Sequence, residues 1–339
     1  MLATAGLCAQ TTAVITSDRD STLYQSPTGA LAGGACTGVF VGVTDQNSNP
    51  LRRALLHFDV AGAIPAGAEI LAAELSIQVT QHNSNVTVRA HRVLQDWGEG
   101  SSLPPGNGGS GTAAATGDAT WVNRFHPGNP WNSPGGDFAA TSSLTFAVPS
   151  PGPATASSTL GAVLDVQDWL DNPGQNFGWL LKTDELQVQS AFRCNSREAS
   201  NNPPTLRVTY VTQGQAGTWG QGCTVSGQEY RHAWNGNPIG GTNVQLAQTN
   251  GPANALAANL MALNYDRIGS PLSTCNLYLP FGGVLITHSI VTLDGGGNGS
   301  AQVAVPTGWP GLMLTTQAAA LANTTAGFVL SNAAIAILQ

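Results

Sequence analysis

Apolar and polar residues alternate over several short stretches in the first two thirds of the chain. In the stretch 52–60, for example, apolar side chains fall on every second position. This period of two is that of a β-strand, whose successive side chains point to opposite faces of a sheet. We predict strands over 52–60, 71–79, 86–91, 144–148, 177–183 and 206–211, with His57 and His91 on outward faces. Segments rich in Gly, Pro and Asn separate these strands, as is typical of β-sandwiches.

One segment has a helical pattern instead. Apolar residues recur at spacings of three and four over 166–170, and the breaker Asn172-Pro173-Gly174 follows. We therefore predict one short helix in the first part of the chain.

The last third contains short apolar runs over 256–263, 283–293, 301–305, 312–316 and 328–338. They predict a second β-sandwich, joined to the first by a linker of Gln, Gly and Thr at 213–218. The predicted fold is all-β with two β-sandwich domains, the first a jelly roll. We expect a signal-peptide remnant at 1–9, the first domain at 10–212 and the second domain at 219–339.

Composition excludes several classes of protein. Only 9% of the residues are charged and the formal net charge is −7, which argues against a nucleic-acid partner because few cations could neutralise phosphates. The absence of a long uninterrupted apolar run argues against a membrane span. Residues 1–9 are apolar and end in small residues, so we expect cleavage before Gln10 and a secreted or extracellular bacterial protein.

The cysteines fit an exported protein. If Cys8 leaves with the signal, four cysteines remain, and an even number in an exported chain predicts disulfides. Two lie in each predicted domain, so we expect the pairs Cys36–Cys194 and Cys223–Cys275.

The chain carries no sequence motif of a hydrolase. Neither a GxSxG nor an HExxH motif occurs. Carboxylates at 165, 168, 171, 184 and 185 could supply the acid pair of a glycosidase, but they surround the predicted helix or a polar turn. The prediction is a protein that is not an enzyme.

The long segment 98–140 contains the best binding candidates. It is rich in Gly, Ser, Pro and Asn, with aromatic residues interleaved, and loops of that length are usually functional. Aromatic rings stack on sugars while amides and carboxylates bind hydroxyl groups. The predicted ligand-binding residues are Trp97, Trp121, Asn123, Asn129, Trp131 and Asp137. Alternatively, Trp97 and Trp121 close the end of the core, and Trp131 is the ring that we expect to be most exposed.

Three ordered segments resemble a known family. They are 53–59 followed by 64–68, then 93–99, and finally 196–199 before 204–210. Over about residues 12–211 the chain resembles the DNRLRE-domain proteins, which are jelly rolls akin to carbohydrate-binding modules. The C-terminal part is similar to a domain recurrent in exported planctomycete proteins, which implies no function.

Asp18 and Asp20 open the first domain and offer the hard oxygen ligands that suit Ca²⁺. The resemblance makes a structural Ca²⁺ near this terminus plausible, while an Asx-turn before a strand is the alternative. Arg53, Asp59, Arg197 and Glu198 belong to the best-matching segments, where an arginine–carboxylate pair would fix the register of neighbouring strands.

These observations favour a non-catalytic secreted or cell-surface protein that binds polysaccharide or another surface polymer. The alternative is a structural subunit of an extracellular filament or matrix, assembled from copies of the chain by pairing of strands such as Thr11–Thr16. A glycan-active enzyme is the third reading.

Overall fold

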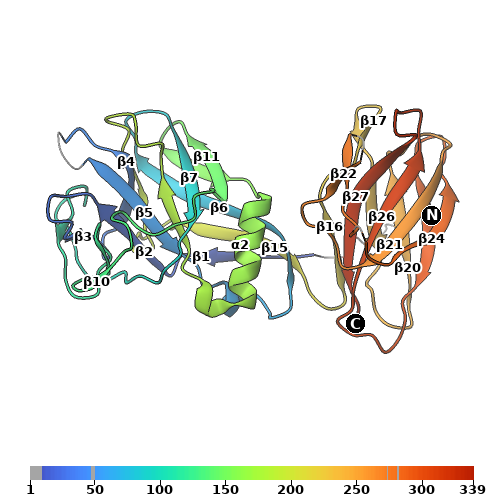
Figure 1. Cartoon of the computed structure of the whole chain (residues 1–339), viewed down its shortest axis with the longest axis horizontal. Helices are drawn as coiled ribbons and strands as arrows, with labels where there is room; N and C mark the ends of the chain where they lie inside the picture. Colours follow the sequence, from blue (N-terminus) through green and yellow to red (C-terminus); the bar gives the residue numbers. More distant parts are fainter. Residues whose placement is uncertain (1–9, 47–49, 273, 281) are drawn as a thin grey trace. The chain divides into compact units, whose positions relative to one another are not determined.

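A computed structural model of the chain describes residues 10–46, 50–272, 274–280 and 282–339. The predicted signal remnant 1–9, with Cys8, lies outside these residues. The fold is all-β, as predicted, and divides into two compact units (Figure 1). The jelly-roll unit comprises Thr12–Ala66 and Ala72–Val208; the C-terminal unit comprises Thr209–Gln339, Gly67–Leu71 and the described residues before Thr12.

The jelly-roll unit is built on one large sheet. Its strands follow the order β1-β15-β6-β14-β4-β5-β13-β7-β11, with β12 beside β6 and β2 beside β5. The two halves of the sheet are joined at β4, which pairs with both β14 and β5. The elements are β1 (Thr11–Thr16), β2 (Arg19–Tyr24), β3 (Leu31–Ala32), β4 (Gly38–Val43), β5 (Leu51–His57), α1 (Val60–Ala63), β6 (Glu69–Gln81), β7 (Val86–Arg92), β8 (Thr112–Ala113), β9 (Asn123–Phe125), β10 (Asn129–Pro130), β11 (Leu144–Val148), β12 (Gly152–Ala156), α2 (Leu160–Asp171), a 3-10 turn η1 (Pro173–Gln175), β13 (Trp179–Lys182), β14 (Phe192–Asn195) and β15 (Thr205–Val211).

The six strands predicted in this unit are confirmed as β5, β6, β7, β11, β13 and β15, although the strand predicted over 52–60 ends at His57 and Val60 begins α1. Strand β5 departs from the predicted pattern, because Leu55 and Leu56 are both fully buried although they point to opposite faces. His57 and His91, predicted on outward faces, are 9% and 6% exposed. The outward face of the sheet is therefore covered as well, which alternation within one strand cannot reveal.

The predicted helix is confirmed as α2, visible in green in Figure 1. It begins at Leu160, because the hydroxyl of Thr159 accepts a hydrogen bond from the backbone N–H of Ala162. It ends at Asp171, directly before the breaker Asn172-Pro173-Gly174.

The C-terminal unit is a sandwich of a five-stranded sheet in the order β16-β27-β26-β21-β24 and a three-stranded sheet in the order β19-β20-β25. One core cluster takes Trp234 and Leu246 from the smaller sheet and Met261, Leu314 and Ala334 from the larger one. The elements are β16 (Gln215–Trp219), β17 (Thr224–Val225), β18 (Gln228–Glu229), β19 (Arg231–Asn235), β20 (Asn243–Thr249), β21 (Leu256–Leu263), β22 (Ser270–Leu272), β23 (Cys275–Leu277), β24 (Leu285–Thr292), β25 (Gly299–Ala304), β26 (Met313–Leu321) and β27 (Phe328–Ile337).

The segment 213–218, predicted as a linker, is mostly strand. Gln215–Trp219 forms β16 and pairs antiparallel with β27, so the prediction of a linker at this place is wrong. Ala216 and Trp219 are buried while Thr218 is exposed. A half-buried strand of small and polar residues has too weak an apolar pattern to stand out in the sequence.

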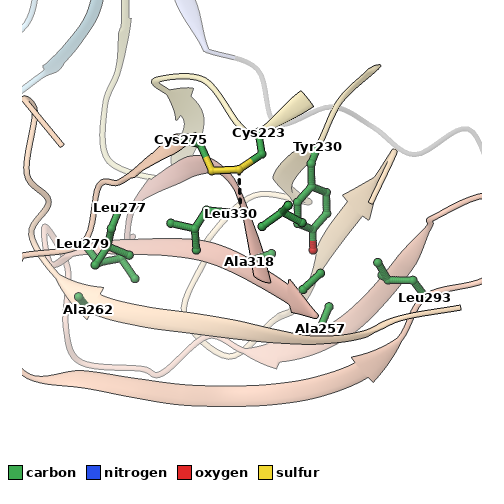
Figure 2. Packing of buried hydrophobic residues seen from close by; sticks show 12 residues of the cluster. Cys223, Tyr230, Ala257, Ala262, Cys275, Leu277, Leu279, Leu293, Ala318 and Leu330 are labelled. Carbon is green, nitrogen blue, oxygen red and sulfur yellow. Dashed lines mark hydrogen bonds between the residues drawn. A yellow bond between two sulfur atoms is a disulfide. The ribbon is translucent and has the colours of Figure 1, made fainter. Parts of the chain in front are cut away.

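The predicted disulfide Cys223–Cys275 is confirmed, and it joins residues 52 positions apart. Figure 2 shows it as part of a buried cluster that contains Tyr230, Leu277 and Leu330. The backbone N–H of Leu330 lies 3.3 Å from the Cys223 sulfur, which links the disulfide to β27 (Figure 2).

The predicted disulfide Cys36–Cys194 is wrong. Both cysteines are buried and carry free thiols. The Cys194 thiol faces the carbonyl of Val39 at 3.8 Å, whereas the Cys36 thiol faces the carbonyl of Asn107 at 3.9 Å. Burial raises the pKa of the Cys194 thiol to about 12, so it stays protonated at neutral pH.

Candidate functional site

The three tryptophans predicted to bind ligand belong to a core cluster. Trp97, Trp121 and Trp131 pack with Leu55 of β5 and Leu180 of β13. Their exposed fractions are 0%, 8% and 4%, so the prediction that Trp131 is the most exposed of the three is wrong, and the alternative that Trp97 and Trp121 close the core is confirmed. The long segment 98–140 folds back over the outer face of β5 and β13, and its tryptophans close that face.

Hydrogen bonds fix two of these rings in place. The indole N–H of Trp97 donates to the carbonyl of Phe177 at 2.9 Å, and that of Trp131 donates to the carbonyl of Thr120 at 3.0 Å. With ring faces packed and N–H groups occupied, these tryptophans cannot stack on a sugar.

Of the other predicted residues in the loop, Asp137 is buried and has protein partners, whereas Asn123 and Asn129 are accessible to solvent. The carboxylate of Asp137 is buried and accepts the backbone N–H groups of Asn132 and Ser133 at 2.7 and 3.0 Å. Asn123 is half-buried in β9, and Asn129 is exposed in the neighbouring strand β10. The structure therefore does not gather the six predicted residues into one binding surface.

Arg53 pairs with Glu185, a carboxylate that was not among the predicted partners, while Asp59 instead caps α1. The Arg53 guanidinium binds both carboxylate oxygens of Glu185, at 2.6 and 2.9 Å, and donates to the carbonyl of Gly135 at 2.7 Å. It also lies over the rings of Trp121 and Phe138. Burial acts to raise the pKa of Glu185, but hydrogen bonding and the charge of Arg53 outweigh it and lower that pKa. Arg53 thus ties β5 to the loop.

The largest hollow that we describe on the jelly-roll unit lies elsewhere, on the half of the sheet formed by β4, β6 and β14. It has a volume of about 880 Å³ and is open to solvent. Its wall combines amide, hydroxyl, carboxylate, imidazole and guanidinium groups with aromatic rings, and its residues include Phe40, Asp45, Thr80, Gln81, His82, Asn83, Gln189 and Arg193.

Arg193 is the cation that lines this hollow, and Asp45 is its acid. The Arg193 guanidinium donates to the hydroxyl groups of Thr80 and Thr37, at 3.0 and 2.9 Å, and to the carbonyl of Asn107 at 3.3 Å. Within the described ranges no carboxylate lies at ion-pair distance from it. Nothing in the sequence alone indicated this group, because the residues that hold it come from four separate segments.

A second cleft, of about 490 Å³, borders Asp137 and Phe138. Its charged groups, Arg53 and Asp137, are already occupied by protein partners. Its exposed polar side chains are those of Asn132 and Ser133. This cleft therefore offers a ligand fewer open polar groups than the larger hollow.

The two residues predicted as metal ligands lie in different surroundings. The carboxylate of Asp18 lies 2.6 Å from Nδ1 of His57. Asp20 is buried and lies instead with Glu99 and Glu198, one carboxylate oxygen from each being within 4.8 Å of the others. The pair Asp18–Asp20 is thus not a common site, whereas Asp20 belongs to a three-carboxylate cluster.

The carboxylates of α2 hold the helix to the sheet. Asp165 is buried; it accepts a hydrogen bond from the indole N–H of Trp179 at 2.8 Å and another from the Ser143 hydroxyl. Burial raises the pKa of Asp165. Asp168 pairs with Arg92, and hydrogen bonding to that guanidinium lowers its pKa. Both groups have structural partners.

These features define an all-β protein of two sandwich units with an open polar hollow on the first. No helix among the described residues has the length and apolarity needed to cross a bilayer. No family model matches the chain, and neither does any curated protein.

Two solved structures show distant likeness. A DUF4785 family protein from Legionella pneumophila has 7% identity and a TM-score of 0.19, over 98% of this chain and 65% of that one. A β-glucuronidase from Parabacteroides merdae has 7% identity and a TM-score of 0.16, over 97% of this chain and 35% of that one. The chain thus spans less than two thirds of either protein, and neither likeness carries an argument about function.

Proposed function

We propose that the jelly-roll unit binds polysaccharide, or another polymer at a cell surface, without catalysis. The observation that carries the proposal is the open hollow of about 880 Å³, whose wall presents amide, hydroxyl and guanidinium groups. Such convergent hydrogen-bonding groups suit the hydroxyl groups of a sugar. The DNRLRE resemblance supports the same function, and the disulfide Cys223–Cys275 supports secretion.

The side chains of Asn83 and Gln189 are suited to a test, because both line the hollow and are exposed. We expect Asn83→Ala and Gln189→Ala each to weaken retention on a bound polysaccharide at least fivefold without lowering the melting temperature. The measurement is affinity electrophoresis against a panel of neutral and acidic polysaccharides.

Asn132→Ala is the matched control, since Asn132 is an equally exposed amide in the second cleft. Loss of binding in the control alone would place the site beside Asp137 and refute the assignment to the hollow. Failure of the wild-type chain to bind any polymer of the panel would refute the function.

The alternative of a structural subunit is favoured by a different observation in the C-terminal unit. Strand β24 is the edge of the larger sheet and exposes Leu285, Ile286 and Ile290 by 46%, 49% and 67%. An exposed apolar edge strand is a template for pairing with another chain. The strand Thr11–Thr16, considered for this role in the sequence, is β1 and lies beside β15 in its own sheet.

If copies assemble through β24, the chain should form oligomers whose mass rises with concentration. Ile290→Lys should abolish them, because a buried charge at the edge opposes pairing. Val14→Lys in β1 is the control. Val14 is 64% exposed, and β1 is an edge strand of the sheet in the jelly-roll unit. A monomer at all concentrations, measured by light scattering, would exclude this alternative.

A further inference from the structure

Three carboxylates that are distant in sequence meet at one place in the jelly-roll unit. Asp20 lies in β2, Glu99 opens the long segment after Trp97, and Glu198 follows β14. One oxygen of each lies within 4.8 Å of the others. The backbone N–H of Asp20 donates to Glu99 at 2.8 Å, and that of Arg197 donates to Asp20 at 2.6 Å. The cluster therefore joins three separate segments.

Among the described residues, Arg197 is the cation that pairs with these acids. The Arg197 guanidinium binds both oxygens of Glu99, at 2.7 and 2.8 Å, and its Nε lies 3.0 Å from Glu198. With all three acids ionised, the group would carry three negative charges against one positive charge. That imbalance is costly at a position where Asp20 is only 1% exposed.

Two of the carboxylate oxygens are buried without a partner. Asp20 Oδ1 and Glu198 Oε2 accept no hydrogen bond from any described residue. Buried oxygens of this kind normally have a donor or a bound ion, because leaving them unsatisfied costs free energy. The described residues alone therefore do not satisfy these two oxygens.

We propose that Asp20, Glu99 and Glu198 bind one Ca²⁺ ion, with Asp20 Oδ1 and Glu198 Oε2 as ligands. The available atoms are all carboxylate oxygens, which hard divalent cations prefer. The ligands come from a strand and two loops with irregular directions, and Ca²⁺ tolerates such geometry whereas Mg²⁺ demands a near-ideal octahedron. Two positive charges would balance the excess of negative charge. The site is separate from the polysaccharide-binding hollow, and it would fix the start of the segment 98–140 to the sheet.

The test uses the full-length chain after treatment with EDTA, titrated with CaCl₂ and, separately, with MgCl₂ in a calorimeter. We expect one Ca²⁺ per chain and a rise in the melting temperature of the jelly-roll unit. Asp20→Asn and Glu198→Gln should each weaken Ca²⁺ binding at least tenfold. Asp18→Asn is the matched control and should bind like the wild type, because Asp18 pairs with His57 outside the cluster.

The melting temperatures of the variants in EDTA show whether Asp20 and Glu198 bind the ion or only stabilise the fold. Asn and Gln keep the shape of the side chains and remove negative charge, so the two variants should melt in EDTA no lower than the wild type and fail to respond to Ca²⁺. Absence of Ca²⁺ binding by the wild type at millimolar concentration would overturn the proposal, as would unchanged binding by both variants. Equal affinity for Mg²⁺ would overturn the assignment to Ca²⁺.

Discussion

The two units have the same kind of fold but satisfy their buried polar groups differently. The jelly-roll unit uses charges, as at the pair Arg53–Glu185, whose side chains are 11% and 12% exposed. The C-terminal unit also has a buried ion pair, Arg267–Glu69, but its central strands use neutral amides. Gln317, fully buried in β26, accepts from the backbone N–H of Tyr278 and donates to the carbonyls of Asn276 and Ser331.

The use of uncharged amide side chains follows from the sequence of the central strands. Strands β26 and β27 pair Thr316 with Ala334 and Gln317 with Ala333, so small residues lie opposite larger polar ones. Asn332 binds both backbone groups of His232, at 2.8 and 2.9 Å. A chain with few charges can thus keep a polar interior, because amides form hydrogen bonds to backbone groups without the desolvation cost of an ion.

The largest difference between the units should appear on reduction of the disulfide. Removing a cross-link between residues 52 apart should cost the C-terminal unit about 4 kcal/mol of unfolding free energy, because the unfolded chain gains freedom. Hydrogen exchange measured by mass spectrometry should show faster exchange after Cys223→Ser with Cys275→Ser, in peptides of the C-terminal unit (209–339) and not in those of the jelly-roll unit.

Cys36→Ala is the control for this experiment. It removes a buried thiol that carries no disulfide, so its effect should be smaller and should not change with reducing agent. Equal exchange in both units after reduction would contradict the idea that the disulfide stabilises one unit only.

In the jelly-roll unit, a comparable loss of stability should come from substitution in the tryptophan cluster under the segment 98–140. Trp131→Ala should lower the unfolding free energy by about 3 kcal/mol, since it leaves a cavity under the segment 98–140. Trp309→Ala in the C-terminal unit should cost less than about 0.5 kcal/mol, because that ring is 58% exposed. Urea denaturation followed by tryptophan fluorescence measures both, and similar values would show that the loop does not pack as described.

These two tryptophans show what a sequence can and cannot reveal. Alternation predicted β5, β6 and β7, because each strand carries its own pattern of apolar residues. The burial of Trp131 depends on contacts with Leu55 and Leu180, which lie far away in sequence, so its surroundings of Gly, Pro and Asn misleadingly suggested exposure. The local composition of a loop therefore predicts its turns, but it does not predict which of its side chains are buried against the sheet.

The acidic cluster and the cysteines illustrate the same limit. Asp20 was recognised as a candidate ligand, but its partners Glu99 and Glu198 are separated from it by most of the unit, and Asp18 was chosen because it is adjacent. The pairing of cysteines by domain was right for Cys223–Cys275 and wrong for Cys36–Cys194, because counting cysteines carries no information on which sulfurs meet.

Acidification should destabilise the C-terminal unit through His232. Burial lowers the pKa of this imidazole from 6.5 to about 3, and its Nε2 lies 2.8 Å from the Thr316 hydroxyl. Between those pH values the unfolded chain binds a proton that the folded unit does not, so stability falls as the pH falls below 6.5. The loss should reach at most about 2 kcal/mol at pH 5.

His232→Gln should flatten this pH dependence, because glutamine does not titrate. Unfolding of the C-terminal unit, followed by hydrogen exchange between pH 7 and pH 5, provides the measurement. Burial also lowers the pKa of His91 in the jelly-roll unit. We therefore expect the stability of that unit to fall with pH as well, but by a smaller amount. A steeper fall in the jelly-roll unit would contradict the assignment to His232.

The smallest effects should come from exposed ion pairs, and they should be equal in the two units. Arg207 pairs with Glu74 at 3.0 Å on the jelly-roll unit, and Arg231 pairs with Glu229 at 3.1 Å on the C-terminal unit. The arginine side chains are 56% and 66% exposed, so water screens both pairs. Arg207→Gln and Arg231→Gln should each change the unfolding free energy by less than about 0.5 kcal/mol, and 0.5 M NaCl should remove the remaining difference. Urea denaturation at low and high salt measures this. A large, salt-resistant loss for Arg207→Gln would mean that charge stabilises the jelly-roll unit at its surface too, whereas two small losses confine the contrast between the units to their buried groups.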